Sequence, residues 1–423
     1  MRVLFISANT ETVNMRTLPW GLWCVAAAAR KAGHDVSVLD LMTQKNPGAA
    51  AAKAVKKADP QVIGISVRNI DDQNMRSPAF LLEKVKQVVA GCRKASDATL
   101  VLGGAGYSIF PESALEFLGA DMGIQGEGEQ AFTVLLDRLS SGADLSDVPG
   151  LHLPGRGLQG KRNFAPDLDA FPCPDEDILA SCRPDENLWL PVQSRRGCFM
   201  NCSYCSTALI EGRELRQRSA RLVVECLEKC SRLGFSRVFF VDNNFNIPKP
   251  YAIEMCRELA GAKLGMTWRC ILNPHNADDD LVKAMAGAGC GEVSLGFESG
   301  SADILRQMRK KFSLEDIRRT AGLLAGHGIR RMGFLLLGGP GETRLSIEES
   351  LAFADSLKLD AVRVTIGIRI YPHTRLAATA KSEGVITPRD DLLYPRFYLA
   401  PGLDDWIQEN LPHWKAARPH WIF

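Results

Sequence analysis

The sequence predicts an α/β protein in which a doubly wound parallel sheet is followed by a partial barrel of parallel strands. Short apolar, β-branched runs alternate with helical patterns twice, first over residues 1–145 and again, with a different spacing, over residues 188–384. Residues 146–187 are rich in Pro, Gly and Asp and are expected to form a linker, and residues 385–423 form a short aromatic extension. A chain of 423 residues is long enough for two such domains.

The first domain is predicted to be Rossmann-like. Its candidate strands are residues 2–7, 35–40, 62–67, 99–104 and 121–126. Helical patterns such as residues 19–33 lie between them, and right-handed βαβ units of this kind build a parallel sheet covered on both faces. Ligands of such sheets bind beyond the carboxyl ends of the strands. The loops that follow those ends here are residues 7–10, 66–71, 103–108 and 126–129.

The second domain is predicted to be a (β/α)6 partial barrel of the TIM type. Its candidate strands are residues 188–194, 237–242, 266–272, 291–297, 330–338 and 361–370. Helices are expected between them, for example at 219–235 and at 313–328, where Ser313 and Asp316 have the spacing of a capping box. Barrels of this type carry their chemistry at the carboxyl ends of the strands.

Composition excludes several classes of protein. With 51 basic and 49 acidic residues the formal net charge is +2, which argues against a dominant nucleic-acid or anionic-membrane surface. The basic runs at 216–221 and 306–311 are interpreted as solvated helix faces. No stretch is long and apolar enough to span a membrane, and no secretory signal is recognised at the N-terminus. Twelve cysteines are then expected to remain thiols or to bind metal in a reducing cytoplasm.

Three cysteines are gathered in one short loop after the first strand of the predicted barrel. Cys198, Cys202 and Cys205 have the spacing CxxxCxxC, which lets three thiolates hold one face of an iron–sulfur cluster and leaves one iron open for chemistry. A structural zinc site would need a fourth ligand, and the next cysteines, Cys226 and Cys230, lie on an apolar helix face, where core packing is the more common role. Zinc and a coincidental grouping of thiols remain the alternatives.

This loop, with Tyr204 before its last cysteine, resembles the signature of the radical S-adenosylmethionine (SAM) superfamily over residues 190–390. The resemblance implies a [4Fe–4S] cluster on Cys198, Cys202 and Cys205, with SAM bound to the fourth iron. Reductive cleavage of SAM would then give a 5′-deoxyadenosyl radical that abstracts hydrogen from the substrate.

The same resemblance implies which residues bind SAM, from motifs at the ends of the barrel strands. These residues are Tyr204, Asp242, Asn243, Arg269, Asn273, Glu298, Ser299, Gly338, Gly339, Ile368 and Ile370. The segment VDNNF at 241–245 departs from the more common Gly-Gly-Glu form of the family. A structural salt bridge is the alternative role for Glu298.

The first domain resembles the cobalamin-binding subfamily of these enzymes, through GGAGYSIFPES at 103–113 and IQGEGEQAF at 124–132. The residues that the resemblance implies for cobalamin are Ser7, Ala8, Asn9, Ser66, Val67, Arg68, Asn69, Gly103, Gly104, Ser108, Gly126, Glu127 and Gly128. The loop SANTETVN at 7–14 contains no histidine, so cobalt is expected to lack a histidine ligand from below, with Arg68 or Asn69 near that face. A scaffold domain without cobalamin is the alternative. A dinucleotide site is disfavoured because no G-x-G-x-x-G follows the first strand.

The function implied is cobalamin-dependent methylation of an unactivated carbon through methylcobalamin. The alternatives are non-methylating radical chemistry, such as cyclisation, ring rearrangement or another alkyl transfer, and a non-catalytic binding protein. The substrate is expected to be a small molecule, a peptide or a lipid-like compound, with flavodoxin or ferredoxin as electron donor and no nucleic acid. No residue is assigned as a catalytic acid, base or nucleophile. Methylthiotransferases need three further cysteines in the first domain, which contains only Cys24 and Cys92.

Overall fold

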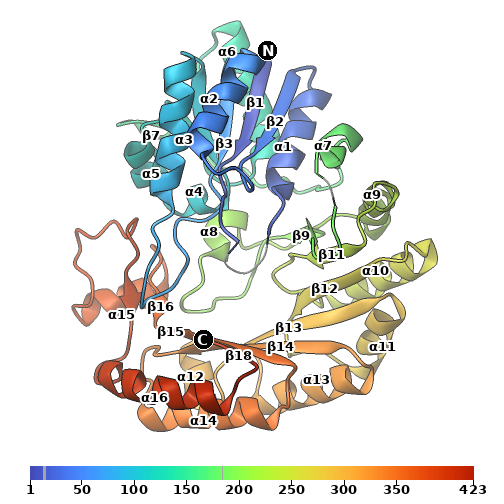
Figure 1. Ribbon diagram of the computed structural model, residues 1–423, viewed down its shortest axis with the longest axis vertical. Coiled ribbons are helices and arrows are strands. Elements are labelled where there is room, and N and C mark those ends of the chain that lie inside the picture. The colour runs from blue at the N-terminus through green and yellow to red at the C-terminus, as the bar shows by residue number, and fades with distance from the viewer. Residues whose placement is uncertain (13–15, 183) are drawn as a thin grey trace. The chain divides into compact units, whose positions relative to one another are not determined.

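The computed structural model describes residues 1–12, 16–182 and 184–423, and the chain folds into two compact units. Unit 1 comprises residues 1–72, 78–188 and 206–218, and unit 2 comprises residues 73–77, 189–205 and 219–423. Each unit is an α/β structure built on a mainly parallel sheet, so the predicted fold class is confirmed (Figure 1).

The sheet of unit 1 has the strand order β2-β1-β3-β4-β5-β6-β7. Its parallel strands are β1 (Arg2–Ser7), β2 (Asp35–Asp40), β3 (Val62–Ser66), β4 (Thr99–Gly103) and β5 (Met122–Ile124), which match the five predicted strands. The order reverses between β1 and β3, and this switch point is where doubly wound sheets bind ligands.

Two antiparallel strands, β6 (Leu151–Leu153) and β7 (Gly157–Leu158), extend this sheet from within the segment that we expected to be a linker. Strands of three and two residues are too short to show a readable alternation of apolar and polar side chains, so β6 and β7 are not predictable from the local pattern. The short helix α7 (Glu176–Ala180) follows in the same segment.

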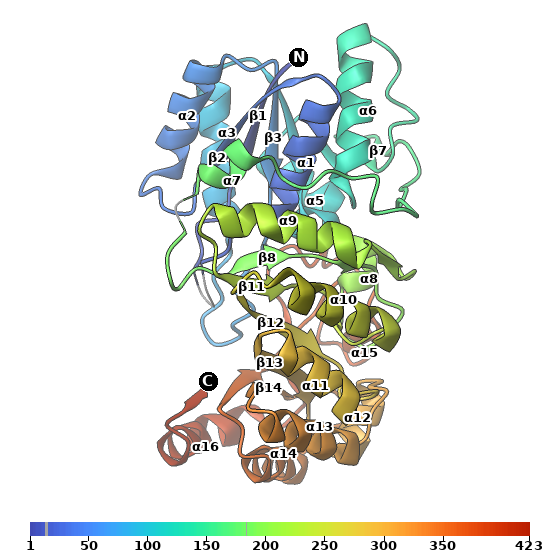
Figure 2. The same ribbon diagram turned by 90° about the vertical axis from the view of Figure 1, so that its right-hand side faces the viewer.

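Helices cover both faces of the unit 1 sheet, as the alternation predicts. They are α1 (Trp20–Lys31), α2 (Pro47–Ala58), α3 (Leu82–Ala95), α4 (Ala105–Ile109), α5 (Pro111–Leu118) and α6 (Gly128–Ser141). Figure 2 shows α2 and α3 on one side of the sheet and α1 and α6 on the other. The buried alanines Ala26, Ala27 and Ala29 let α1 lie close to its neighbours. Unit 1 also contains α8 (Thr207–Glu211) and β10 (Arg216–Gln217).

The sheet of unit 2 is parallel throughout, in the order β8-β11-β12-β13-β14-β15-β18. Six strands correspond to those predicted: β8 (Leu190–Val192), β11 (Arg237–Phe240), β12 (Thr267–Leu272), β13 (Cys290–Glu298), β14 (Arg330–Leu337) and β15 (Ala361–Ile366). Pro191 is tolerated in β8 because this strand lies at an edge of the sheet. The seventh strand, β18 (Trp421–Ile422), was not predicted, and it pairs with β15 through the register Val362↔Trp421.

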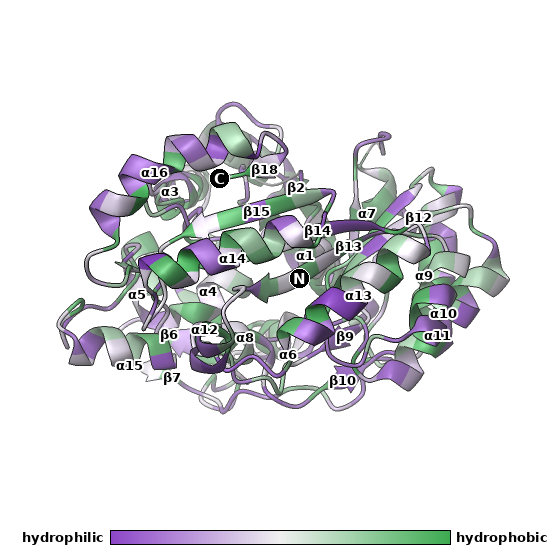
Figure 3. Ribbon diagram, turned by 90° about the horizontal axis from the view of Figure 1, so that it is seen from below, coloured by the Kyte–Doolittle hydropathy of each residue, from purple (hydrophilic) through white to green (hydrophobic). Residues whose placement is uncertain are grey.

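Amphipathic helices flank the strands of unit 2. They are α9 (Ala220–Arg232), α10 (Lys249–Ala262), α11 (Asp279–Gly287), α13 (Leu314–Gly326) and α14 (Arg344–Ser356). Figure 3 shows hydrophilic and hydrophobic residues on both α13 and α14. The capping box at Ser313 and Asp316 is present, because each side chain accepts a hydrogen bond from the other residue's backbone N–H.

Several short elements and one further helix, α16 (Asp404–Ala417), complete unit 2. The short elements are β9 (Arg195–Arg196), α12 (Ala302–Gln307), β16 (Ile368–Arg369), α15 (Arg375–Ser382) and β17 (Phe397–Tyr398). Among the residues that the structure describes, no helix is both long enough and apolar enough to cross a membrane.

The core of unit 2 lies between its sheet and its helices. Phe240 and Phe245 both pack on Trp268, with ring centroids 5.4 and 4.9 Å from the Trp268 ring. Cys226 and Cys230 of α9 are buried in this apolar layer, as the periodicity of the helix predicts. They are core residues and lie apart from the three-cysteine loop in sequence.

Candidate active site

The three-cysteine loop begins beyond β8, at the carboxyl end of the unit 2 sheet. Cys198 and Cys202 are half-buried and Cys205 is exposed. Two backbone hydrogen bonds of Ser203 hold the middle of the loop: its N–H donates to Met308 O at 3.1 Å, and its carbonyl accepts from Leu376 N at 2.9 Å. The loop therefore presents its thiols from a fixed backbone, as a cluster ligand loop requires.

Asp242 lies two residues beyond β11, and its carboxylate is fully buried. Oδ1 accepts the backbone N–H groups of Ser194 at 2.7 Å and of Arg195 at 3.1 Å, and Oδ2 accepts the Ser194 hydroxyl. The Arg195 guanidinium, which is 2% exposed, completes the ion pair at 3.3 Å. The carboxylate of Asp242 therefore holds Ser194 and Arg195, which lead into the cysteine loop.

Glu298 ends β13 and lies beside the cysteine loop. Its φ of +67° is unusual for a residue other than glycine. The Tyr204 hydroxyl donates to Glu298 Oε1 at 3.1 Å, and the Lys310 ammonium donates to the same oxygen at 3.0 Å. Burial, and then the charge of Glu298, raise the pKa of Tyr204 well above its ordinary value, so the hydroxyl stays protonated. The structure thus brings two predicted SAM residues together and adds a lysine that the sequence did not suggest.

Other predicted SAM residues are already engaged within unit 2. Ser299 is fully buried, and its hydroxyl lies 2.9 Å from that of Ser350. The backbone of Asn273 pairs with the side chain of the fully buried Asn246, a residue that no sequence motif marks. Asn243 lies in the loop after β11, on the chain next to Asp242.

Arg269 lies within β12, three positions before its end. Its guanidinium packs over the rings of Trp189 at 4.3 Å and Phe239 at 4.6 Å, and it pairs with Glu292 at 3.3 Å. Burial lowers the pKa of Arg269, an effect that the Glu292 carboxylate opposes.

The turn after β14 contains an isolated buried carboxyl. Oε2 of Glu342 accepts the N–H groups of Gly338 at 2.6 Å and Gly339 at 3.0 Å, while Oε1 has no partner among the described residues. Burial raises the pKa of Glu342 to about 7, against the two backbone hydrogen bonds that lower it. Ile368 and Ile370 are buried near the next strand end.

In unit 1, the loops at the switch point lie together. Ala8 N donates to Ser66 O at 3.2 Å and Leu41 N donates to Ser7 O at 3.1 Å, which ties the end of β1 to both neighbouring strands. Ala8, Asn9, Val67, Arg68 and Asn69, all predicted to bind cobalamin, line one pocket. Asn9 is 8% exposed and its amide nitrogen has no partner among the described residues, so this donor is available to a polar ligand. Residues 13 and 14 of the first loop lie outside the described residues.

The turn after β4 approaches these loops closely. Val67 N donates to Gly103 O at 2.8 Å, and a Cβ at Gly104, where φ is +99°, would lie 2.6 Å from Val67 O. Only glycine fits that contact. The Ser108 hydroxyl is fully buried and bridges two predicted segments: it donates to Gly104 O and accepts from Gly126 N, each at 2.9 Å.

Glu127, at the start of α6, forms a buried ion pair with Arg216 at 2.6 Å. Its second oxygen accepts from Ala165 N at 3.0 Å, and Arg216 also donates to Glu211 O at 2.8 Å. The predicted turn at 126–128 therefore anchors the segment 206–218, which follows the cysteine loop in the sequence, within unit 1. The adjacent Gly128 packs against Val25 of α1.

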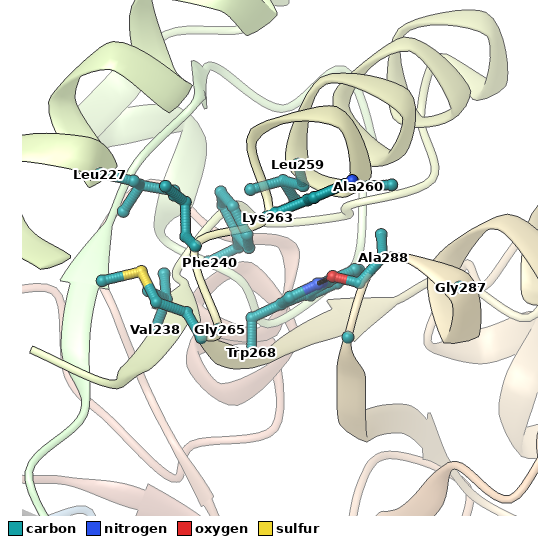
Figure 4. A pocket seen from close by; sticks show the side chains of 13 residues that line it. Leu227, Val238, Phe240, Leu259, Ala260, Lys263, Gly265, Trp268, Gly287 and Ala288 are labelled. Atoms are coloured by element: carbon teal, nitrogen blue, oxygen red, sulfur yellow. Dashed lines mark hydrogen bonds between the residues drawn. The ribbon is translucent and has the colours of Figure 1, made fainter.

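A cavity of about 190 Å³ lies at the opposite end of the unit 2 strands from the cysteine loop (Figure 4). Leu227, Phe240, Met266 and Trp268 supply apolar walls, and Lys263, in the loop that precedes β12, also lines the cavity. Because barrel chemistry takes place at the carboxyl ends of the strands, this cavity is not part of the candidate active site.

Two family models match the chain. Residues 192–354 match the radical SAM superfamily, and residues 6–136 match the B12-binding domain. The chain belongs to the cobalamin-binding radical SAM enzymes. Its cofactors are a [4Fe–4S] cluster, SAM and cobalamin, and the predictions of family and cofactors are confirmed. The Cys198–Cys205 loop and the pocket at Asn9 fall within the matched segments, one in each domain.

Three related proteins can be aligned with most of the length of this radical SAM enzyme. An uncharacterized methyltransferase of Pyrococcus horikoshii is 28% identical over 89% of this chain and 82% of that protein. The anaerobic magnesium-protoporphyrin IX monomethyl ester cyclase of Rubrivivax gelatinosus is 27% identical over 84% of this chain and 65% of that protein. Among solved structures, the radical SAM methyltransferase TsrM of Kitasatospora setae, with tryptophan and a SAM analogue bound, has a TM-score of 0.87 at 21% identity, over 100% of this chain and 90% of that one. The last likeness shows the fold.

Proposed function

We propose that this enzyme transfers the methyl group of SAM, by way of cobalamin, to an unactivated carbon of an organic substrate. The observation that carries the proposal is the match to a protein named as a methyltransferase over 89% of this chain, which spans both cofactor domains. A cobalamin-binding domain gives a radical SAM enzyme a group able to accept and pass on a methyl group, which the cluster domain alone does not have.

The chain's own residues have distinct parts in this proposal. Cys198, Cys202 and Cys205 hold the cluster and leave one iron to SAM. Tyr204, within that loop, and Glu298, beside it, contact SAM. In unit 1, Asn9 and the loop at 66–69 contact cobalamin, and none of the residues named for that face is a histidine.

Non-methylating radical chemistry is the second candidate, since a cyclase is among the relatives that match 84% of this chain. The two candidates differ in their products. Methyl transfer consumes one SAM to give S-adenosylhomocysteine and a second to give methionine and 5′-deoxyadenosine, whereas cyclisation gives only the second pair. Methylthio transfer is set aside because the first domain, residues 1–145, contains only Cys24 and Cys92, which are buried and are too few for a second cluster.

The substrate proposed is a small molecule, a peptide or a lipid-like compound, in keeping with a net charge of +2. A flavodoxin or ferredoxin supplies the electron. We also propose a cytoplasmic location: all twelve cysteines lie among the described residues and none forms a disulfide.

Anaerobic incubation of the reconstituted enzyme with SAM labelled in its methyl group tests the proposal. Reduced cobalamin and a strong reductant are supplied, and the nucleosides are identified by mass spectrometry. We expect S-adenosylhomocysteine together with 5′-deoxyadenosine. Deoxyadenosine alone, with cobalamin bound, would favour the second candidate, and a protein that binds all three cofactors and leaves SAM intact would have no catalytic role.

A further inference from the structure

Lys310, whose side chain is largely buried, lies beside the cysteine loop, and its basic run is therefore not simply a solvated helix face. The end of α12 places it there. Arg309 N donates to Arg306 O at 3.0 Å and Lys310 N donates to Leu305 O at 2.9 Å, the pair of bonds that defines a Schellman motif. Arg309 takes the left-handed position of that motif with a φ of +61°, and the chain turns so that Lys310 points inward.

The Lys310 ammonium is enclosed by polar and aromatic groups of unit 2. The side chain is 9% exposed, and Nζ lies 3.0 Å from Glu298 Oε1 and 3.3 Å from Gly296 O. The Tyr204 ring centroid lies 5.4 Å from Nζ and that of Phe312 lies 5.7 Å away. The adjacent Lys311 is exposed, which makes it a natural control.

Lys310 keeps its positive charge in this environment. Burial by itself would lower the pKa of the ammonium, but the Glu298 carboxylate, 3.0 Å away, raises the pKa above its ordinary value.

The backbone keeps the lysine and the cysteine loop together. Ser203, between Cys202 and Tyr204, donates its N–H to the carbonyl of Met308, two residues before Lys310. Tyr204 and Lys310 in turn share one oxygen of Glu298. A fixed positive charge in a site shielded from water acts more strongly on a neighbouring charge than one at the surface.

We propose that Lys310 makes one-electron reduction of the [4Fe–4S] cluster more favourable by placing a permanent positive charge beside its ligand loop. This rests on the cluster assignment made above. The cluster gains one electron from a low-potential one-electron donor, which is oxidised. No bond is formed or broken in this step and no proton is taken up, since Lys310 is already protonated. Lys310 stabilises the added negative charge, and this sets it apart from a ligand of SAM.

Potentiometric titration of the reconstituted full-length protein without SAM, followed by electron paramagnetic resonance, tests the proposal. In Lys310→Met and in Lys310→Gln we expect at least a tenfold loss in the equilibrium constant for reduction, which corresponds to a midpoint potential about 59 mV more negative for one electron. Lys310→Arg keeps the charge and Lys311→Met removes a charge from the surface. Both should remain close to the wild-type potential.

Iron and sulfide contents show whether each variant holds its cluster. A full cluster in Lys310→Met with an unchanged potential would overturn the proposal. So would a neutral variant that only weakens SAM binding, or loss of the cluster from both neutral variants, because Lys310 would then serve SAM or loop assembly. The titration needs neither substrate nor turnover, so its result stands even if methyl transfer is not the reaction.

Discussion

Asp242 and Ser194 are joined by two hydrogen bonds between the carboxyl ends of β11 and β8. The Asp242 carboxylate accepts the Ser194 N–H at 2.7 Å through one oxygen and the Ser194 hydroxyl through the other. Arg195, the next residue, adds a buried ion pair to the same carboxylate. Since Cys198 lies three residues beyond Arg195, we propose that Asp242 positions the start of the cysteine loop.

We expect Asp242→Asn to lower the free energy of unfolding by about 3 kcal/mol, because it leaves the Arg195 charge buried without its partner. The iron content after reconstitution should fall with it. Urea unfolding and iron analysis measure the two effects. The control is Asp280→Asn, which changes an exposed carboxylate of α11 and should alter neither. A variant with wild-type stability and iron content would contradict this role for Asp242.

Cys202→Ala is expected to abolish formation of the [4Fe–4S] cluster and of 5′-deoxyadenosine while leaving cobalamin binding largely intact. The three cluster cysteines belong to unit 2, and the residues proposed to bind cobalamin belong to unit 1. Iron and sulfide analysis, nucleoside analysis and the cobalamin absorption spectrum test this directly. Cys256→Ala removes a buried thiol of α10 and serves as the control for loss of a cysteine outside the loop. If Cys202→Ala also loses cobalamin, the assignment of separate cofactors to the two units fails.

Asn9→Ala is expected to weaken cobalamin binding about tenfold, the effect of losing one buried hydrogen bond. The amide nitrogen of Asn9 is buried and has no partner among the described residues, so a bound ligand can supply one. Equilibrium dialysis with hydroxocobalamin gives the affinity. Asn163→Ala removes an exposed amide of the same unit, and its affinity should equal that of the wild type. Unchanged binding in Asn9→Ala would remove this residue from the cobalamin site.

Glu342 should make the stability of unit 2 depend on pH. Burial raises the pKa of its carboxyl from 4.5 to about 7, so the folded protein holds the proton more tightly than the unfolded chain. The stability that this contributes is fully present below the unfolded value and is lost as pH rises through the folded one. Between about pH 5 and about pH 8, the loss amounts to about 2.5 kcal/mol.

Glu342→Gln removes this titration, and we expect the difference in unfolding free energy between wild type and variant to change by about that amount over the same interval. Urea unfolding at the two pH values provides the measurement. Glu348→Gln, on the exposed face of α14, is the matched control. A constant difference across the interval would show that Glu342 does not carry a raised pKa.

Local patterns in the sequence were sufficient for the strands and for the cluster loop. Apolar runs long enough to show their period identified the five parallel strands of unit 1 and six of the seven in unit 2. Cys198, Cys202 and Cys205 were recognisable because ligand spacing within a single loop is a property of consecutive residues. The strands β6, β7 and β18 have only two or three residues each, and pairing with distant partners decides whether such segments become strands.

The sequence by itself determined the order of the two domains and the family of the enzyme, and it predicted the cluster ligands. Only the tertiary structure decided which charged residues are buried and which groups they contact. In the sequence, Lys310 is one of several cations in a basic run. The chain turns before it at Arg309, whose φ is positive although it is not a glycine, and Lys310 contacts Glu298 as a result. Asp242 was predicted to contact SAM, and only the fold shows that its carboxylate binds Ser194 at the end of β8. Burial and charge pairing depend on contacts between segments far apart in the chain, and a pattern of neighbouring residues cannot predict such contacts.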